Sequence, residues 1–86
     1  MIRVLMLCLL TALPAAAAER SIILASTTST QNSGLLEAIL PLFTAKTGIA
    51  VHVVAVGTGQ ALRIARNGDA DLLLVHHRPS EDEFVA

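Results

Sequence analysis

The sequence predicts an α/β fold, with a parallel sheet flanked by helices. Three short apolar segments, residues 21–25, 49–56 and 72–75, alternate with two segments whose apolar residues recur at helical spacing, residues 35–43 and 61–65. This alternation favours a parallel sheet, because right-handed crossovers carry the chain over a helix from one strand to the next. The nearly continuous valine content of residues 49–56 is also typical of a parallel strand that is covered on both faces.

The first 18 residues have the pattern of a secretory signal peptide, so we expect them to lie outside the fold. Arg3 supplies a positive charge, residues 4–10 form an unbroken apolar run, and residues 14–18 provide a proline and four alanines that suit cleavage before Glu19. The run is too short to span a bilayer, which predicts no membrane insertion after cleavage. This interpretation places the protein in the periplasm; an N-terminal membrane anchor is the alternative.

Composition sets limits on the remaining residues, 19–86. The chain has 86 residues, six of them basic and seven acidic, and only 2% are aromatic. Neither a basic stripe nor stacking aromatic residues are present, so the sequence does not favour nucleic-acid binding. A segment of this length buries a thin core, and we therefore expect it to be the beginning of a larger, incomplete domain.

The first helical segment, residues 35–43, is followed by signals for its end. Pro41 should kink this helix rather than end it, because the apolar spacing continues to Phe43. Lys46 suits the last turn, and Gly48 can take the left-handed conformation just beyond it. Further along, the acidic run at residues 81–83 is interpreted as the solvated start of another helix.

Polar segments follow all three predicted strands, at residues 26–33, 57–60 and 76–80. Ligands of parallel sheets bind at the carboxyl ends of the strands. The first segment carries six hydroxyls within eight residues, and the first two segments each precede a helix, where unpaired N–H groups and the helix dipole favour an anion. We call residues 26–33 the first corner and residues 57–60 the second corner, and together they predict an anion site. In the alternative interpretation, Asn32 or Ser33 merely caps the helix.

Several other kinds of site are not favoured. The turn at residues 57–60 lacks the third glycine of a dinucleotide-binding motif, since that position holds Leu62. His76 and His77 are adjacent in an extended segment and should point to opposite faces, so we expect His76 to face the rim as a hydrogen-bond donor rather than to bind a metal. A serine–histidine catalytic pair is conceivable, but neither an orienting carboxylate nor a nucleophile elbow is evident.

The chain resembles the N-terminal part of the periplasmic solute-binding proteins of tungstate ABC transporters. The resemblance covers nearly all of residues 19–86, and its specific feature is the hydroxyl-rich loop followed by the Val-Gly-Thr-Gly-Gln-Ala-Leu block. The matching blocks are Ser26-Thr27-Thr28-Ser29, Ser33-Gly34-Leu35-Leu36, Leu40-Pro41-Leu42-Phe43 with Thr47-Gly48, Val56-Gly57-Thr58-Gly59-Gln60-Ala61-Leu62, Asn67-Gly68-Asp69-Ala70-Asp71 and Leu74-Val75-His76.

The resemblance implies the first-lobe portion of a two-lobed type II periplasmic binding protein fold that closes on its ligand. It implies that Thr27, Thr28 and Ser29 donate hydrogen bonds to the oxyanion, with Thr58 and the neighbouring Gly59 opposite. It further implies a non-enzymatic protein that needs no cofactor, binds tungstate or a related oxyanion, and delivers it to the permease of an ABC importer.

This sequence departs from the family pattern in two respects. Ser26 replaces the first threonine of the loop and keeps its hydroxyl, whereas the second lobe and a later anion-binding arginine are absent; Arg78 does not occupy that position. We therefore expect residues 19–86 alone to bind weakly. An exported hydrolase, or the sensor lobe of a membrane signalling protein, remains an alternative, and the residues do not separate tungstate from molybdate, sulfate or phosphate.

Overall fold

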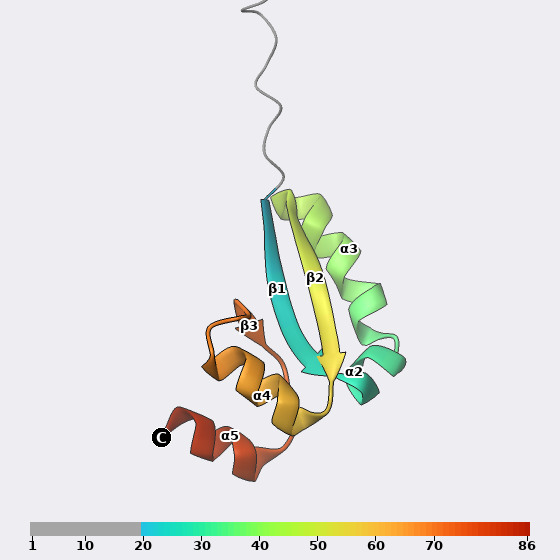
Figure 1. Cartoon of the computed structure of the whole chain (residues 1–86). Helices are drawn as coiled ribbons and strands as arrows, with labels where there is room; N and C mark the ends of the chain where they lie inside the picture. Colours follow the sequence, from blue (N-terminus) through green and yellow to red (C-terminus); the bar gives the residue numbers. More distant parts are fainter. Residues whose placement is uncertain (1–19) are drawn as a thin grey trace, which may run out of the picture.

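The computed structural model describes residues 20–86, so the predicted signal peptide, residues 1–18, lies outside the described residues. Seven elements follow one another along the chain (Figure 1). They are β1 (Arg20–Thr27), α2 (Thr28–Asn32), α3 (Leu35–Thr47), β2 (Ile49–Val56), α4 (Thr58–Arg66), β3 (Leu72–Leu73) and α5 (Arg78–Val85).

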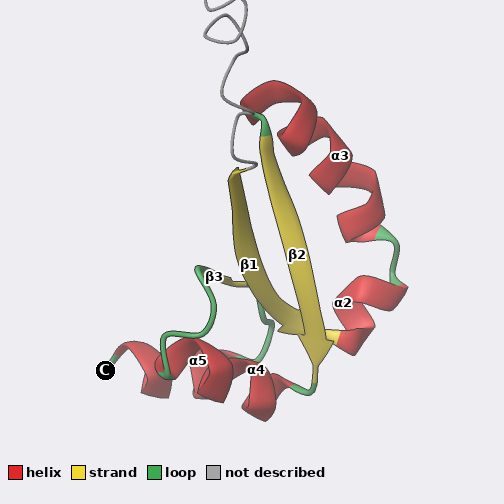
Figure 2. Ribbon diagram, turned by 45° about the horizontal axis from the view of Figure 1, so that its top comes forward, coloured by secondary structure: helices red, strands yellow, loops and turns green. Residues whose placement is uncertain are grey.

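The three strands form one parallel sheet in the order β2-β1-β3, which confirms the predicted fold class. β1 pairs with β2 along its whole length, from Arg20 opposite Ile49 to Thr27 opposite Val56. The crossover through α3 moves from β1 to one side, and the crossover through α4 moves back past β1 to the other side. Right-handed connections in opposite directions place the two helices on opposite faces of the sheet (Figure 2).

The helix α3 continues through Pro41 and ends where the sequence predicted. Lys46 lies in its last turn, and Gly48 follows with a φ of 75°, donating its N–H to the carbonyl of Thr44 at 2.8 Å. A left-handed residue at this position satisfies one of the last carbonyls of the helix, and glycine adopts it without a steric cost.

The most buried apolar side chains gather around the carboxyl-terminal half of β1. They belong to β1, to the first turn of α3 and to α4: Leu24, Ala25, Leu36, Ala61 and Leu62. By contrast, the amino-terminal half of β1 is more open, and Ile23 is 38% exposed. The well-packed part of the fold therefore lies directly next to the strand ends from which α2 and α4 begin.

The third strand is shorter and more exposed than predicted. Only Leu72–Leu73 pair with β1, and the side chain of Leu72 is 53% exposed. Before the strand, Asp71 makes two hydrogen bonds with the backbone of Ile23. Its carboxylate accepts from the Ile23 N–H at 2.8 Å, and its own N–H donates to the Ile23 carbonyl at 2.9 Å. A side chain thus replaces part of the strand pairing.

The second strand has the predicted bounds but is only half-buried, with His52 exposed. Its position at the outer edge of the described sheet accounts for this exposure. The acidic run at residues 81–83 lies in α5, as predicted, and Arg78 forms an exposed ion pair with Asp82 in the same helix. Across residues 20–86, no helix combines the length and the apolar character needed to cross a bilayer.

Candidate functional site

The two predicted polar corners lie at the same edge of the sheet. Thr27 and Val56 are paired neighbours at the ends of β1 and β2, and α2 and α4 begin immediately beyond them (Figure 1). Paired strands lie about 4.8 Å apart. Thr28, the first residue of α2, and Thr58, the first residue of α4, therefore start from the same edge of the sheet, although no Cα atom of α2 lies within 8 Å of one of α4.

The first corner begins later than predicted, because β1 extends to Thr27. Ser26 and Thr27 are strand residues with side chains that are almost fully buried, at 0% and 3% exposure. The hydroxyl of Ser26 donates to the carbonyl of Leu74 at 2.8 Å, which ties the segment after β3 to β1. The exposed hydroxyls of this corner consequently start at Thr28.

A short helix, α2, separates this corner from the longer helix that the sequence predicted next. Thr27 caps α2, since its Oγ1 accepts from the Thr30 N–H at 3.2 Å. The start of α3 is therefore displaced from the strand end, and it follows Gly34, which has a φ of 84°. Gly34, and neither Asn32 nor Ser33, is the N-cap of α3; Ser33 precedes the cap and its hydroxyl accepts from the Leu35 N–H at 3.2 Å.

His76 joins the first corner from the segment that follows β3. Its Nε2 lies 3.0 Å from Oγ of Ser29 and 3.3 Å from Oγ1 of Thr27. The predicted rim-facing orientation of His76 agrees with these distances, but the sequence did not indicate Ser29 and Thr27 as its partners. Within residues 20–86, no group of three or more metal-ligating side chains is present.

The second corner presents backbone donors at the start of α4. Gly57 precedes this helix in an extended conformation, and its carbonyl accepts the first intrahelical bond from Ala61 at 2.9 Å. The N–H groups of the first three helical residues, Thr58 to Gln60, have no intrahelical acceptor. Thr58 is half-buried and Gly59 is exposed, so these donors are accessible from the edge of the sheet.

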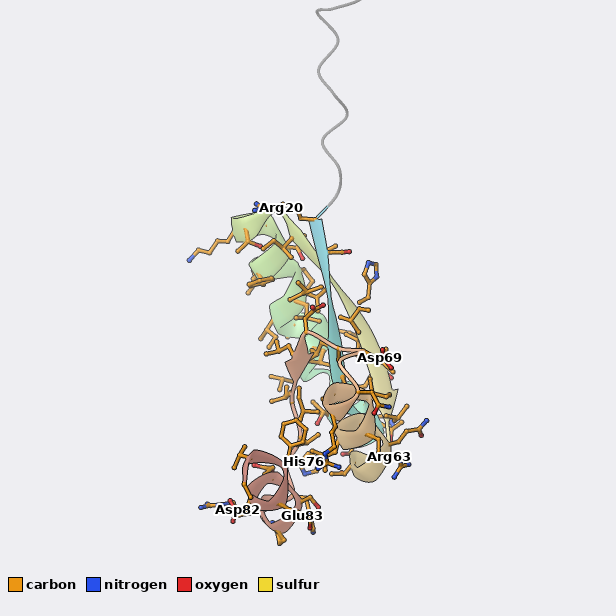
Figure 3. The ribbon with its side chains drawn as sticks, turned by 60° about the vertical axis from the view of Figure 1, so that its left-hand side comes forward. Arg20, Arg63, Asp69, His76, Asp82 and Glu83 are labelled. Atoms are coloured by element: carbon orange, nitrogen blue, oxygen red, sulfur yellow. The ribbon has the colours of Figure 1, made fainter. Side chains whose placement is uncertain are left out.

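The arginines of α4 lie away from the hydroxyls of the first corner, although a guanidinium nitrogen of Arg63 comes close to Gly59 of the second. Arg63 and Arg66 lie in the last turn of this helix, and Arg66 stacks over the ring of Phe84 at 5.4 Å from its centroid. Figure 3 shows Arg63 pointing away from His76. A hollow between α4 and α5 contacts Gly59 and both arginines but none of the hydroxyls of the first corner. The hydroxyls and backbone N–H groups that we consider as anion donors are therefore neutral.

Comparisons with known proteins agree with this arrangement. Residues 14–86 match the model of the PBP superfamily domain. The tungstate-binding protein TupA of Peptoclostridium acidaminophilum is 62% identical over 69 residues, which are 80% of this chain and 24% of that protein. TupA of Campylobacter jejuni is 46% identical over 57 residues, which are 66% of this chain and 21% of that protein. The chain thus spans about a quarter of the length of these relatives.

Two solved structures share the fold over the matched part. The tungstate ABC transporter structure from Geobacter sulfurreducens superposes with a TM-score of 0.76 at 51% identity, covering 79% of this chain and 29% of that one. The tungstate-binding protein of Desulfovibrio alaskensis G20 gives 0.74 at 48% identity, covering 77% of this chain and 26% of that one. At such identities the backbone described here is the one these proteins use.

Proposed function

Because the chain belongs to the PBP superfamily and has part of the type II periplasmic binding fold, we propose that it binds a tetrahedral oxyanion where β1 and β2 end. The observation that carries this proposal is the pairing of Thr27 with Val56, which brings two donor-rich corners to one edge. Tungstate is the favoured anion, since the relatives named above are tungstate-binding proteins. We further propose a periplasmic location after signal cleavage and delivery to an ABC permease.

The donors divide into exposed groups and one supporting group. Thr28 and Ser29 are exposed on the first corner, while Thr58 and the N–H of Gly59 face the same edge from the second. We assign these four residues to direct contact with the anion. Thr27 is buried and its hydroxyl already caps α2, so its contribution is to hold the other hydroxyls in place.

Neutral donors suit a dianion that must later be released. Hydrogen bonds to an ionised acceptor are about twice as strong as those between neutral groups. The start of the nine-residue helix α4 adds the positive end of its dipole without a fixed charge. An empty site of this kind leaves no buried charge unpaired, whereas a lysine or arginine in the same place would need a partner when the anion departs.

A titration followed by nuclear magnetic resonance tests the proposal. We expect sodium tungstate to shift the amide signals of residues 27–30 and 57–60 in the ¹⁵N-labelled chain, with a dissociation constant near the millimolar range, or about −4 kcal/mol. Binding should be weak because Thr28, Ser29 and Gly59 are open to solvent. Calorimetry should accordingly show little heat, and a sub-micromolar constant would contradict this account of the open edge.

Matched variants make the titration specific. Thr28→Val and Thr58→Val should each weaken binding, whereas Thr47→Val should leave it unchanged, because Thr47 ends α3 beside the start of β2 and donates to the carbonyl of Phe43. Chloride at the same ionic strength should shift none of the corner amides. Shifts spread evenly over the chain, or absent from both corners, would overturn the proposal.

One observation favours a second candidate, an exported hydrolase: Oγ of Ser29 lies 3.0 Å from Nε2 of His76. A nucleophile and its general base are found at such distances. Among the described residues, however, no carboxylate is hydrogen-bonded to Nδ1 of His76. We therefore propose that the protein is not an enzyme and expect no ester hydrolysis by the chain, before or after Ser29→Ala, although this substitution should weaken anion binding.

A further inference from the structure

The backbone that carries His76 is fixed on both sides of the residue. Before it, Leu74 donates its N–H to the carbonyl of Ala25 at 2.9 Å and accepts from the hydroxyl of Ser26 at 2.8 Å. After it, His77 caps α5, with its own N–H donating to the carboxylate of Glu81 at 2.6 Å. The imidazole is therefore delivered to the first corner by anchored segments, even though its ring is exposed.

The contacts of the imidazole leave two possible arrangements of protons. A hydroxyl has one proton to donate and two lone pairs to accept with. If Nε2 carries no proton, it accepts, and the hydroxyl of Ser29 must turn its proton inward to satisfy it at 3.0 Å. If Nε2 carries the proton, it donates to Oγ of Ser29, and the proton of Ser29 is free to point outward.

Thr27 is the more distant of the two hydroxyls that could donate to a bare Nε2, at 3.3 Å against 3.0 Å for Ser29. Its Oγ1 already accepts from the Thr30 N–H at 3.2 Å and lies 2.8 Å from the hydroxyl of Thr30. It is also 3.2 Å from Oγ of Ser29 and 3.3 Å from Nε2 of His76. The hydroxyls of Thr27, Ser29 and Thr30 each have one proton for these contacts. Because Ser29 makes the shorter contact with Nε2, the state of Nε2 bears first on the direction in which the exposed hydroxyl of Ser29 donates.

An oxyanion without protons can only accept, and therefore needs the hydroxyl protons to point outward. We propose that His76 is a positioning residue of the anion site: it holds a proton on Nε2, donates it to Oγ of Ser29, and so directs the proton of Ser29 toward the anion. This inference rests on the proposed function, because it concerns the same site. His76 acts through Ser29 and does not itself contact the anion.

The proton on Nε2 of His76 also distinguishes an anion-binding site from a hydrolytic one. A histidine that acts as general base toward a serine must have a bare nitrogen to receive the serine proton. A proton on Nε2 excludes this role and favours the outward donor. The tautomer of one side chain thus distinguishes the two candidate functions, although the 3.0 Å distance is compatible with both.

Long-range ¹H–¹⁵N spectra of the chain, recorded at pH 8 with and without sodium tungstate, measure the tautomer directly. We expect the proton of His76 to reside on Nε2 in both samples. A bare Nε2 in the presence of tungstate would overturn the inference. If tungstate shifts no amide of either corner, the proposed function is wrong. If tungstate binds but Nε2 carries no proton, only the role of His76 is wrong.

Two variants provide the second measurement. His76→Gln keeps an N–H donor at a similar reach and should retain the tungstate affinity within about threefold, whereas His76→Leu should lose about tenfold, the effect of one hydrogen bond to a polar partner. A purely structural role predicts equal losses in both, and that result would overturn the inference. Should His76→Leu fail to give a dispersed spectrum, the tautomer of the unmodified chain and the affinity of His76→Gln still decide.

Discussion

Replacing Thr27 with valine should lower the free energy of unfolding without removing a direct contact to the ligand. Valine has nearly the same shape as threonine, so the substitution removes the hydroxyl and leaves the packing of the β1 end intact. The lost hydroxyl caps α2 through the Thr30 N–H and is 2.8 Å from Oγ1 of Thr30. Because Thr27 is only 3% exposed, water cannot readily replace these bonds.

The expected loss is about 2 kcal/mol in the free energy of unfolding. The removal of a threonine cap costs about 1 kcal/mol and up to 2, and the loss of the contact with the half-buried hydroxyl of Thr30 adds about 1 kcal/mol. Such a loss lowers the ratio of folded to unfolded chains about 30-fold, a large change for a fold that rests on a few buried side chains.

Urea unfolding followed by far-ultraviolet circular dichroism measures this loss. With an m value of about 1 kcal/mol/M for a chain of this size, the midpoint of Thr27→Val should fall by about 2 M at unchanged m. Thr28→Val is the matched control, since Thr28 is the exposed next residue and should change the stability by less than about 0.5 kcal/mol. Equal shifts of the urea midpoint in the two variants would refute the burial argument. If Thr27→Val is unfolded in buffer, its stability can be measured with trimethylamine N-oxide, which favours the folded state.

Two other ties to β1 allow similar tests. Ser26→Ala should cost about 1–2 kcal/mol, because it leaves the carbonyl of Leu74 without its buried donor, and urea unfolding together with faster amide exchange at Leu74 would report it. Asp71→Ala should cost about 1 kcal/mol by removing the acceptor of the Ile23 N–H, whereas Asp71→Asn keeps a weaker acceptor and should lie between this variant and the parent in thermal unfolding. Equal melting temperatures for the two Asp71 variants would contradict this reasoning.

The sequence was sufficient for the fold class because the local signals agreed with one another. The bounds of β2 and the end of α3 at Gly48 follow from a valine-rich run and from a glycine placed just after a helical pattern. The exposure of β2 and the brevity of β3 could not be predicted, since they depend on which strand lies in the centre of the sheet. The order of strands is a tertiary property that periodicity does not contain.

The candidate site was predictable in place but not in detail. Each corner could be located because it follows an apolar segment, and parallel strands bring their carboxyl ends to one edge. The burial of Ser26 and Thr27 was not predictable, because serine and threonine after a short apolar run can belong either to a loop or to the last residues of a strand. The contact of His76 with Ser29 also spans 47 positions, and only the pairing of β3 with β1 brings the two together.

The position of the buried side chains explains why such a thin core can support a site. Leu24 and Ala25 are buried next to the strand end, and Ala61 in the first turns of α4 is fully covered. By contrast, Ile39, Leu42 and Phe43 of α3 are all at least 38% exposed. The donors of both corners are therefore attached to the best-packed part of the chain. Hydroxyls held by a rigid support lose less entropy on meeting an anion, so the described residues concentrate their order where the proposed ligand would bind.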